Sequence, residues 1–242
     1  MQPTTIRNEL IKAARDRSRA SLDEHSAKLV LEGFRVSIPR GCRVSIADTD
    51  LAQLDNLNSP WALKIISPDI QHKSDGGFVA LSLTDKDRVR QEIENMSGRA
   101  LESGCAVDGF LVEEMANPGI EIIIGGFNDA CFGPAIMFGL GGVFVEVLGD
   151  VAFRVCPINH LDAEDMIDEL VGRRIFEGAR GGVKADRQTL VELLLAVGGE
   201  DGLIVTMNSE IEEIDLNPII VNGDQATAVD AVMILRKQGN TS

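Results

Sequence analysis

The feature that most constrains this chain is a short apolar run that leads directly into a polar loop. Residues 61–66 are apolar except for Lys64, and Pro68 then opens a charged stretch that ends in Gly76 and Gly77. A short apolar run bounded by turn residues is typical of a buried strand. An ammonium group inside such a run needs a nearby anion, because an unpaired charge is costly to bury. We therefore expect a buried strand that presents Lys64 to an anion such as phosphate.

His72 lies at the centre of this loop, beside Lys73 and between Asp69 and Asp75. A carboxylate that accepts a hydrogen bond from one ring nitrogen keeps the imidazole in one tautomer. The other nitrogen can then attack phosphorus or a carbonyl carbon. A single histidine in a polar loop can equally be a solvated side chain. The loop residues alone thus leave His72 either as a nucleophile or as a surface group.

Composition sets the broad class of the protein. The chain has 242 residues, is 44% hydrophobic and 25% charged, and carries a formal net charge of −15. These values indicate a globular protein with either one large domain or two small lobes. The acidic charge argues against nucleic-acid and anionic-membrane partners. No run approaches the ~18 apolar residues of a membrane span, and residues 1–19 lack a secretory pattern, so we expect a cytoplasmic protein.

The periodicity of the remaining sequence predicts an α+β fold. Helical spacing of apolar residues predicts helices over residues 6–19, 21–31, 85–103, 162–170 and 186–197. We expect a capping box of Ser21 and Glu24 at the second of these helices, and Asp162 as the cap of the fourth. Apolar runs predict an antiparallel sheet of residues 109–115, 120–126 and 133–140, and hairpins that pair 61–66 with 78–83 and 211–220 with 226–235.

Carboxylates occur at the end of one apolar strand and inside the next. Glu113 and Glu114 close the run that ends at Met115, and Glu121 is surrounded by isoleucines. Glu114 can be part of a solvated strand face. Glu121 either points out of a half-exposed sheet or lines a polar site. Further along, the glycines of residues 139–142 lack the spacing of a P-loop or a dinucleotide fold.

A row of oxygen-bearing side chains lies near the C-terminal end. Glu213, Asp215 and Asn217 alternate along one predicted strand, so they share a face. Such a row is unfavourable unless a cation joins it, and Mg²⁺ prefers hard oxygen ligands of this kind. Asp230, on the following strand, could reach the same ion. The alternative is an exposed acidic edge strand.

Taken together, these motifs resemble the ATP-grasp, or beta, subunit of ADP-forming acyl-CoA synthetases, relatives of succinyl-CoA synthetase. The resemblance covers residues 21–235 and is strongest at residues 67–75, 137–158, 212–218 and 229–231. It implies an ATP-grasp fold, in which two α+β lobes bind nucleotide between them. The expected division is a helical extension over residues 1–20 and an ATP-grasp domain over residues 21–242, with a smaller lobe at about 40–108 and a larger lobe at about 109–235.

The resemblance also implies roles for individual residues. His72 would take up and pass on a phosphoryl group. The strand that ends at Met115 would contact adenine, Glu121 would contact ribose, and Arg154 is either a phosphate contact or a surface residue. The expected nucleotide-binding residues are Lys64, Glu113, Glu114, Met115, Glu121 and Arg154. The expected magnesium ligands are Asp215, Asn217 and Asp230, and Glu213 is a further candidate.

The implied enzyme is an acid–CoA ligase that converts a carboxylic acid, ATP and CoA into acyl-CoA, ADP and phosphate. Its cofactors would be ATP or ADP and Mg²⁺. The chain lacks a CoA-binding fingerprint, so it would need a CoA-binding alpha subunit, in a heterotetramer of two copies of each. Two residues depart from the family pattern: Phe78 replaces a glycine, and Val232 replaces an arginine. The alternatives are a stand-alone ATP-grasp ligase without phosphohistidine, and a nucleotide-binding regulatory or assembly subunit.

Overall fold

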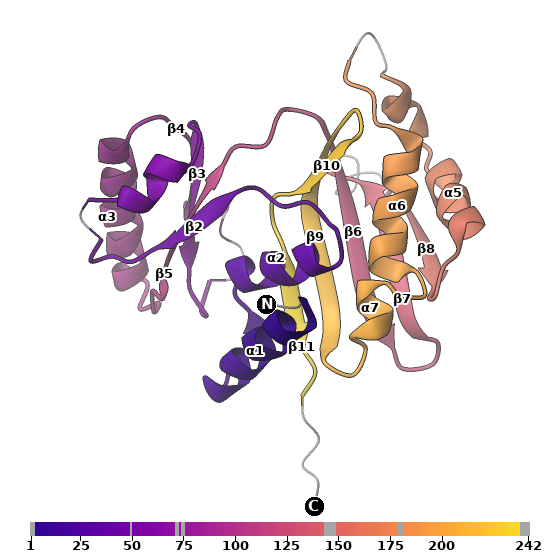
Figure 1. The fold of residues 1–242 in the computed structure, drawn as a ribbon, viewed down its shortest axis with the longest axis horizontal. Helices are drawn as coiled ribbons and strands as arrows, with labels where there is room; N and C mark the ends of the chain where they lie inside the picture. Colours follow the sequence, from indigo (N-terminus) through magenta and orange to yellow (C-terminus); the bar gives the residue numbers. More distant parts are fainter. Residues whose placement is uncertain are drawn as a thin grey trace, which may run out of the picture. The chain divides into compact units, whose positions relative to one another are not determined.

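The computed structural model describes residues 3–48, 50–70, 73, 76–142, 149–178 and 182–237. The chain divides into two compact units, which Figure 1 shows in sequence colours: residues 39–116 form the smaller unit, and residues 1–38 with 117–242 form the larger unit. The lobe boundaries that the sequence suggested stay a prediction. Among the helices that the structure describes, none is long and apolar enough to cross a membrane.

The larger unit is built on an antiparallel sheet. Its described strands run in the order β1-β11-β9-β6-β7-β8, with β10 paired to β9. The strands are β1 Ser21–Leu22, β6 Ile120–Asp129, β7 Gly133–Leu140, β8 Val151–Val155, β9 Ile211–Asn222, β10 Gln225–Ala228 and β11 Val232–Leu235. The helices are α1 Pro3–Asp16, α2 Glu24–Gly33, α5 His160–Glu169, the 3₁₀ helix η2 Arg173–Glu177, α6 Arg187–Gly198 and α7 Leu203–Thr206.

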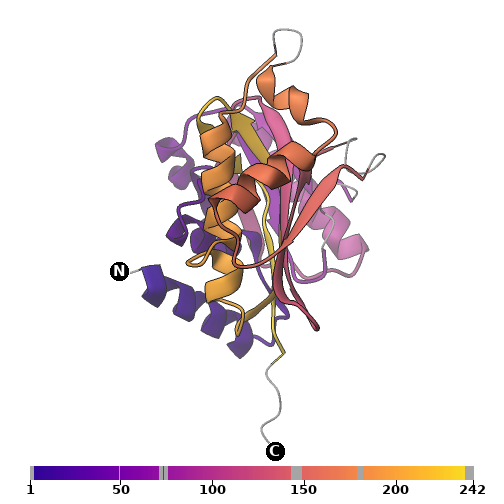
Figure 2. The ribbon, with the colours of Figure 1, turned by 90° about the vertical axis from the view of Figure 1, so that its right-hand side faces the viewer.

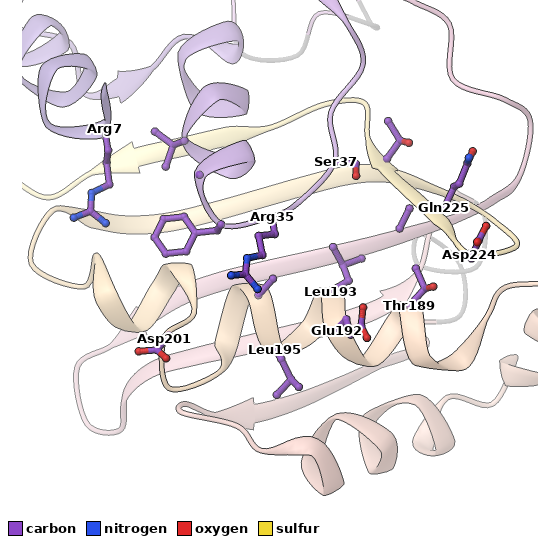
Figure 3. A pocket seen from close by; sticks show the side chains of 16 residues that line it. Arg7, Arg35, Ser37, Thr189, Glu192, Leu193, Leu195, Asp201, Asp224 and Gln225 are labelled. Carbon is purple, nitrogen blue, oxygen red and sulfur yellow. The ribbon is translucent and has the colours of Figure 1, made fainter. Parts of the chain in front are cut away.

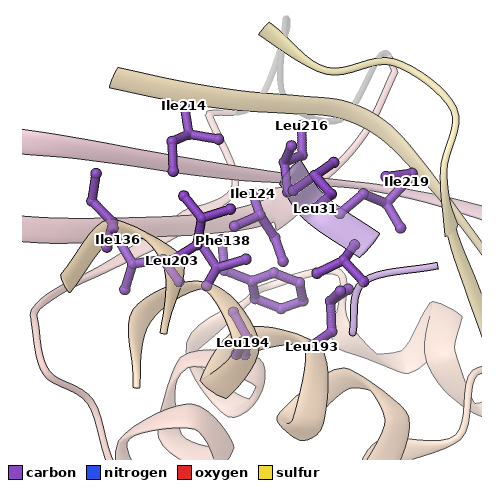
Figure 4. Close-up of a cluster of buried hydrophobic side chains, with 14 of the residues drawn as sticks. Leu31, Ile124, Ile136, Phe138, Leu193, Leu194, Leu203, Ile214, Leu216 and Ile219 are labelled. Carbon is purple, nitrogen blue, oxygen red and sulfur yellow. The ribbon is translucent and has the colours of Figure 1, made fainter. Parts of the chain in front are cut away.

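The core of the larger unit lies between the sheet and its helices. Figure 2 shows α5, α6 and α7 on one side of β6, β7 and β8. Figure 4 shows how side chains from the sheet, such as Ile124, Phe138 and Leu216, meet Leu194 and Leu203 of the helices, and all five are fully or almost fully buried. Burial of each such side chain contributes about 1.5–3 kcal/mol relative to exposure. One face of β9 is therefore fixed inward, and its other face is left for polar residues.

The smaller unit is a four-stranded antiparallel sheet in the order β2-β5-β3-β4. Its elements are β2 Gly41–Val44, the 3₁₀ helix η1 Ala52–Asn56, β3 Trp61–Ile66, β4 Val79–Leu83, α3 Lys86–Glu102 and β5 Gly109–Glu114. The central strand β3 is buried along its whole length, because β5 and β4 pair with its two edges and α3 covers it. This arrangement confirms the predicted hairpin, and it places the polar loop at the end of a rigid strand.

Several local predictions are confirmed. The helix predicted over residues 85–103 is α3, and the helix predicted over 186–197 is α6, with Asp186 as its cap. The α+β class also holds. The turn after β9 joins β9 to β10, and β11 pairs with the same edge of β9 further along that strand, while β6 pairs with the other edge. The predicted second strand of that hairpin is thus split into two strands.

Three local predictions are wrong. Ser21 does not cap α2, because it is a residue of strand β1 and pairs with Ile234 of β11. The N-cap of α2 is Asp23, whose carboxylate accepts a hydrogen bond from the Ser26 amide at 3.1 Å. Asn159, rather than Asp162, is the N-cap of α5, and the two residues together form its capping box. The run at residues 109–115 does not join the two following runs in one sheet, because β5 pairs with β2 and β3.

Candidate nucleotide and metal site

The smaller unit pairs the buried lysine of β3 with a carboxylate of β5. Nζ of Lys64 lies 3.2 Å from Oε2 of Glu113, and the two side chains are 8% and 3% exposed. The anion that the sequence required thus comes from the chain itself. An ammonium group has three N–H donors, so this ion pair is compatible with a second, phosphate contact.

The end of β5 is tied to the loop before β3. Oε1 of Glu114 accepts hydrogen bonds from the backbone N–H of Asn58 at 2.9 Å and from its side chain at 3.1 Å, and it lies 3.2 Å from Arg40. The N–H of Met115 donates to the carbonyl of Pro60 at 3.1 Å. Glu114 is therefore neither an exposed strand-face residue nor an unpaired acid: it holds two segments of the smaller unit together.

Glu121 is an exposed residue of β6 in the larger unit, opposite Ile220 of β9. The glycines that follow β7 pack directly against it. The N–H of Gly141 donates to the Glu121 carbonyl at 2.8 Å, and a Cβ added to Gly141 would lie 3.0 Å from the Glu121 Cβ. The close approach of the two backbones explains why residue 141 is a glycine. Residues 143–148, which follow these glycines, lie outside the described part of the chain.

Arg154 of β8 is bound by a carboxylate of the neighbouring helix α5. Its two terminal nitrogens contact the two oxygens of Glu169 at 2.9 and 2.5 Å. This hydrogen-bonded pair raises the pKa of Arg154 and lowers the pKa of Glu169. A phosphate that approached Arg154 would have to compete with Glu169, and the phosphate role of Arg154 stays a prediction.

The acidic row lies on one face of β9, as alternation predicts. Ile214 and Leu216 are buried, whereas Glu213, Asp215 and Asn217 lie on the opposite, partly exposed face. Asp230 lies in the connection between β10 and β11, not on a strand.

The carboxylates of Asp215, Asp230 and Glu213 in the larger unit interact electrostatically. Burial, and then the charges of Asp230 and Glu213, raise the pKa of Asp215. A cation beside Asp215 would relieve this unfavourable charge, so the donor set fits Mg²⁺. Within the described ranges, no group of three or more acidic, histidine or cysteine side chains is already arranged as a metal site.

His72 and Asp75 lie outside the described residues. The flanking Asp69 is described, and its carboxylate accepts a hydrogen bond from the backbone N–H of Ala106 at 2.8 Å. The structure therefore describes both ends of the loop that carries His72, although it does not describe the residue itself.

A buried ion pair supports the Asp230 segment and was missed in the sequence. Nζ of Lys28 lies 2.8 Å from Glu24 and donates to the Val229 carbonyl at 2.7 Å, and the side chains of Lys28 and Glu24 are 1% and 2% exposed. The N–H of Val229 in turn donates to the Pro218 carbonyl at 3.1 Å. The available signal was Glu24 four residues before Lys28, a spacing that places both on one helix face.

The larger unit also has a hollow that contains none of these candidate residues. It has a volume of about 1150 Å³. Figure 3 shows Arg7 and Arg35 on one side of it, and Glu192, Asp201 and Asp224 among the residues that line the rest. Its mixed charge identifies no particular ligand.

Known proteins resemble this chain over almost its whole length. The family model described as an ATP-grasp domain matches residues 13–235. The beta subunit of ADP-forming acetate–CoA ligase II of Pyrococcus furiosus is 37% identical over 232 residues, which cover 94% of this chain and 97% of that subunit.

Solved structures agree with this relationship. The dinucleotide-forming acetyl-coenzyme A synthetase 1 of Ca. Korarchaeum cryptofilum, in complex with coenzyme A, Ca-AMPCP and HgCl⁺, is 36% identical with a TM-score of 0.87, and the match covers 94% of this chain and 99% of that chain. A second structure of that enzyme contains coenzyme A and Mg-AMPPCP, with its phosphohistidine segment pointing towards the nucleotide-binding site. It is 35% identical, has a TM-score of 0.80, and covers 95% of this chain and 100% of that chain. The chain therefore belongs to the ATP-grasp family, among the beta subunits of ADP-forming acyl-CoA synthetases.

Proposed function

We propose that this chain is the ATP-binding subunit of an enzyme that converts a carboxylic acid, ATP and CoA into acyl-CoA, ADP and phosphate. The observation that carries the proposal is the match to a beta subunit of ADP-forming acetate–CoA ligase over 94% of this chain. The buried Lys64 and the acidic face of β9 support it, since both suit the binding of a metal-bound triphosphate.

His72 is the proposed phosphoryl carrier. A neutral ring nitrogen attacks the γ-phosphorus of ATP, a nitrogen–phosphorus bond forms, and the bond from phosphorus to the oxygen of the departing ADP breaks. Lys64 balances negative charge on the phosphate oxygens. Asp215, Asn217 and Asp230 would hold Mg²⁺, which neutralises charge on the nucleotide phosphates when it is bound. The remaining nucleotide contacts are proposed for Glu113, Glu114, Met115, Glu121 and Arg154.

The proposed partner is a CoA-binding alpha subunit, which receives the phosphoryl group. We propose a heterotetramer with two copies of each subunit. A cytoplasmic location goes with this function, because the reaction uses ATP and CoA and all four cysteines of the chain are free thiols.

The test is phosphorylation by ATP labelled at its γ-phosphorus. The wild-type chain should acquire an acid-labile label, and His72→Ala should lose it while binding nucleotide nearly as tightly. His160→Ala is the matched control, because His160 is an exposed histidine in the larger unit. An acid-labile label that persists on His72→Ala would contradict the assigned carrier.

The labelling experiment, together with an assay of CoA-dependent phosphate release and acyl transfer with and without the CoA-binding subunit, separates the alternatives. A stand-alone ATP-grasp ligase predicts no phosphohistidine but continued acyl transfer without a partner. A regulatory or assembly subunit predicts stabilisation by ATP without CoA-dependent release of phosphate, even when the CoA-binding subunit is present.

A further inference from the structure

The end of the loop that carries His72 is held by an arginine of helix α3. Nη2 of Arg99 donates a hydrogen bond of 2.5 Å to the carbonyl of Gly77. The guanidinium carbon of Arg99 also lies 6.0 Å from the centre of the Phe78 ring, within the range of a cation–π contact. One side chain thus holds two consecutive residues where the loop returns to the sheet.

Phe78 links this contact to the core. Its side chain is 7% exposed and belongs to the hydrophobic core of the smaller unit. Its carbonyl accepts a hydrogen bond from the N–H of Ile65 at 3.1 Å, and its own N–H donates to the carbonyl of Lys73 at 2.9 Å. Phe78 therefore connects β3, the hydrophobic core and the residue that follows His72.

The two glycines before Phe78 fit this arrangement. Gly77 has a φ of +69°, a conformation that glycine adopts without strain. A Cβ added to Gly76 would lie 2.5 Å from the Phe78 ring, so the ring occupies the space that any larger residue would need.

The beginning of the loop is held separately. The Asp69 carboxylate accepts the N–H of Ala106 at 2.8 Å, and the Asp69 N–H donates to the Ser67 hydroxyl at 3.1 Å. His72 therefore belongs to a short stretch with described contacts on both sides, Asp69 before it and Lys73 after it.

We propose that Arg99, acting through Gly77 and Phe78, is a positioning residue that fixes the end of the histidine loop for phosphoryl transfer. The inference rests on the proposed function of His72. A nucleophile held in a narrow range of positions reacts faster than the same group on a loosely held chain. Loss of the Arg99 contacts should therefore slow the transfer and leave nucleotide affinity unchanged.

The test uses the complete complex with its CoA-binding subunit. Rapid mixing with labelled Mg-ATP measures how fast His72 is phosphorylated, and nucleotide binding is measured separately. We expect Arg99→Leu to slow phosphorylation about 10-fold, with nucleotide affinity within about 2-fold of the wild type. Arg99→Lys keeps a charged donor and should recover part of the rate, whereas Phe78→Leu keeps an apolar core residue but loses the ring contact and should be slowed.

The matched control is Arg88→Leu on the same helix. The Arg88 side chain is 71% exposed and its salt bridge is to Asp85, so the loop should not respond to its loss. A wild-type chain that acquires no acid-labile label would overturn the proposed function and this inference with it. A labelled wild type with Arg99→Leu phosphorylated at the same rate would overturn only the positioning role. Two other results would also overturn the positioning role of Arg99. One is slower phosphorylation of Arg99→Leu with an equal loss of nucleotide affinity, and the other is a rate that Arg99→Lys does not recover at all. A general structural defect would produce both results.

Discussion

Replacement of Lys28 by methionine removes a charge from inside the core of the larger unit. The Lys28 side chain is 1% exposed, and its Nζ contacts Glu24 at 2.8 Å and the Val229 carbonyl at 2.7 Å. Methionine fills a similar volume, so the substitution tests the charge and its hydrogen bonds rather than the packing. Glu24 would keep its buried carboxylate but lose this counter-charge.

The expected cost follows from this geometry. Two unit charges 2.8 Å apart attract each other by about 6 kcal/mol at an effective dielectric constant of about 20. Dehydration of the ions offsets much of this attraction in the intact pair, but the single variant keeps the dehydration cost of Glu24. We therefore expect Lys28→Met to lower the free energy of unfolding by about 3–5 kcal/mol. Lys28→Met/Glu24→Leu also removes the buried carboxylate, so it should cost less than the single variant; its cost includes the hydrogen bond to Val229, about 1–3 kcal/mol.

Urea unfolding followed by circular dichroism measures these differences, and hydrogen exchange of the α2 amides assigns them to the larger unit. The control is Lys86→Met, because Lys86 makes an ion pair of the same 2.8 Å length with Asp55, but with side chains 28% and 70% exposed. An exposed pair should contribute less than about 1 kcal/mol. The reasoning is refuted if Lys28→Met costs no more than Lys86→Met, or if the double variant is less stable than the single one.

Two further predictions concern the larger unit. The hydrogen bond from Arg187 lowers the pKa of Asp168, so this pair stabilises the fold above the unfolded Asp pKa of about 3.9 and loses its effect as the pH falls through the lower folded value. In urea unfolding curves, Arg187→Leu should thus cost about 0.5 kcal/mol at pH 7 and progressively less as the pH falls below about 3.9. A cost that does not fall with the pH would contradict this. Asp215→Asn should raise the melting temperature of the metal-free protein, because burial and nearby carboxylates disfavour the Asp215 charge. The same substitution should weaken Mg²⁺ binding, measured by calorimetry, by at least about 10-fold. A lower melting temperature, or an unchanged Mg²⁺ affinity, would count against the site.

The sequence predicted features that depend on neighbouring residues. The helix over residues 186–197, the buried run at β3 and the alternation of β9 are all local patterns, and the structure has each of them. The need of Lys64 for an anion was also predictable, because burial of a charge imposes it. The ion pair between Glu113 and Lys64 was not predicted, because the pairing of β3 with β5 decides which carboxylate reaches Lys64. From the sequence, Glu113 was expected only as a nucleotide contact.

The sequence failed where distant segments decide the structure. Ser21 satisfies the pattern of a helix cap, but pairing with Ile234 more than 200 residues later makes it a strand residue. β5 is largely apolar, as are the strands that follow it, and nothing local shows that it joins another sheet. The buried Lys28 was missed because its hydrogen bond to Val229 spans 201 positions.

The larger unit is discontinuous in sequence, since residues 39–116 interrupt it. The two points of interruption lie at one end of its sheet: Ser37 bridges to Thr227 of β10, and the Pro118 carbonyl accepts a hydrogen bond from Asn222 at the end of β9. The smaller unit is thus an insertion between residues 38 and 117 of the larger unit. No described strand of the larger sheet lies within residues 39–116, so exchange of this segment between homologous proteins should leave the strands of that sheet intact.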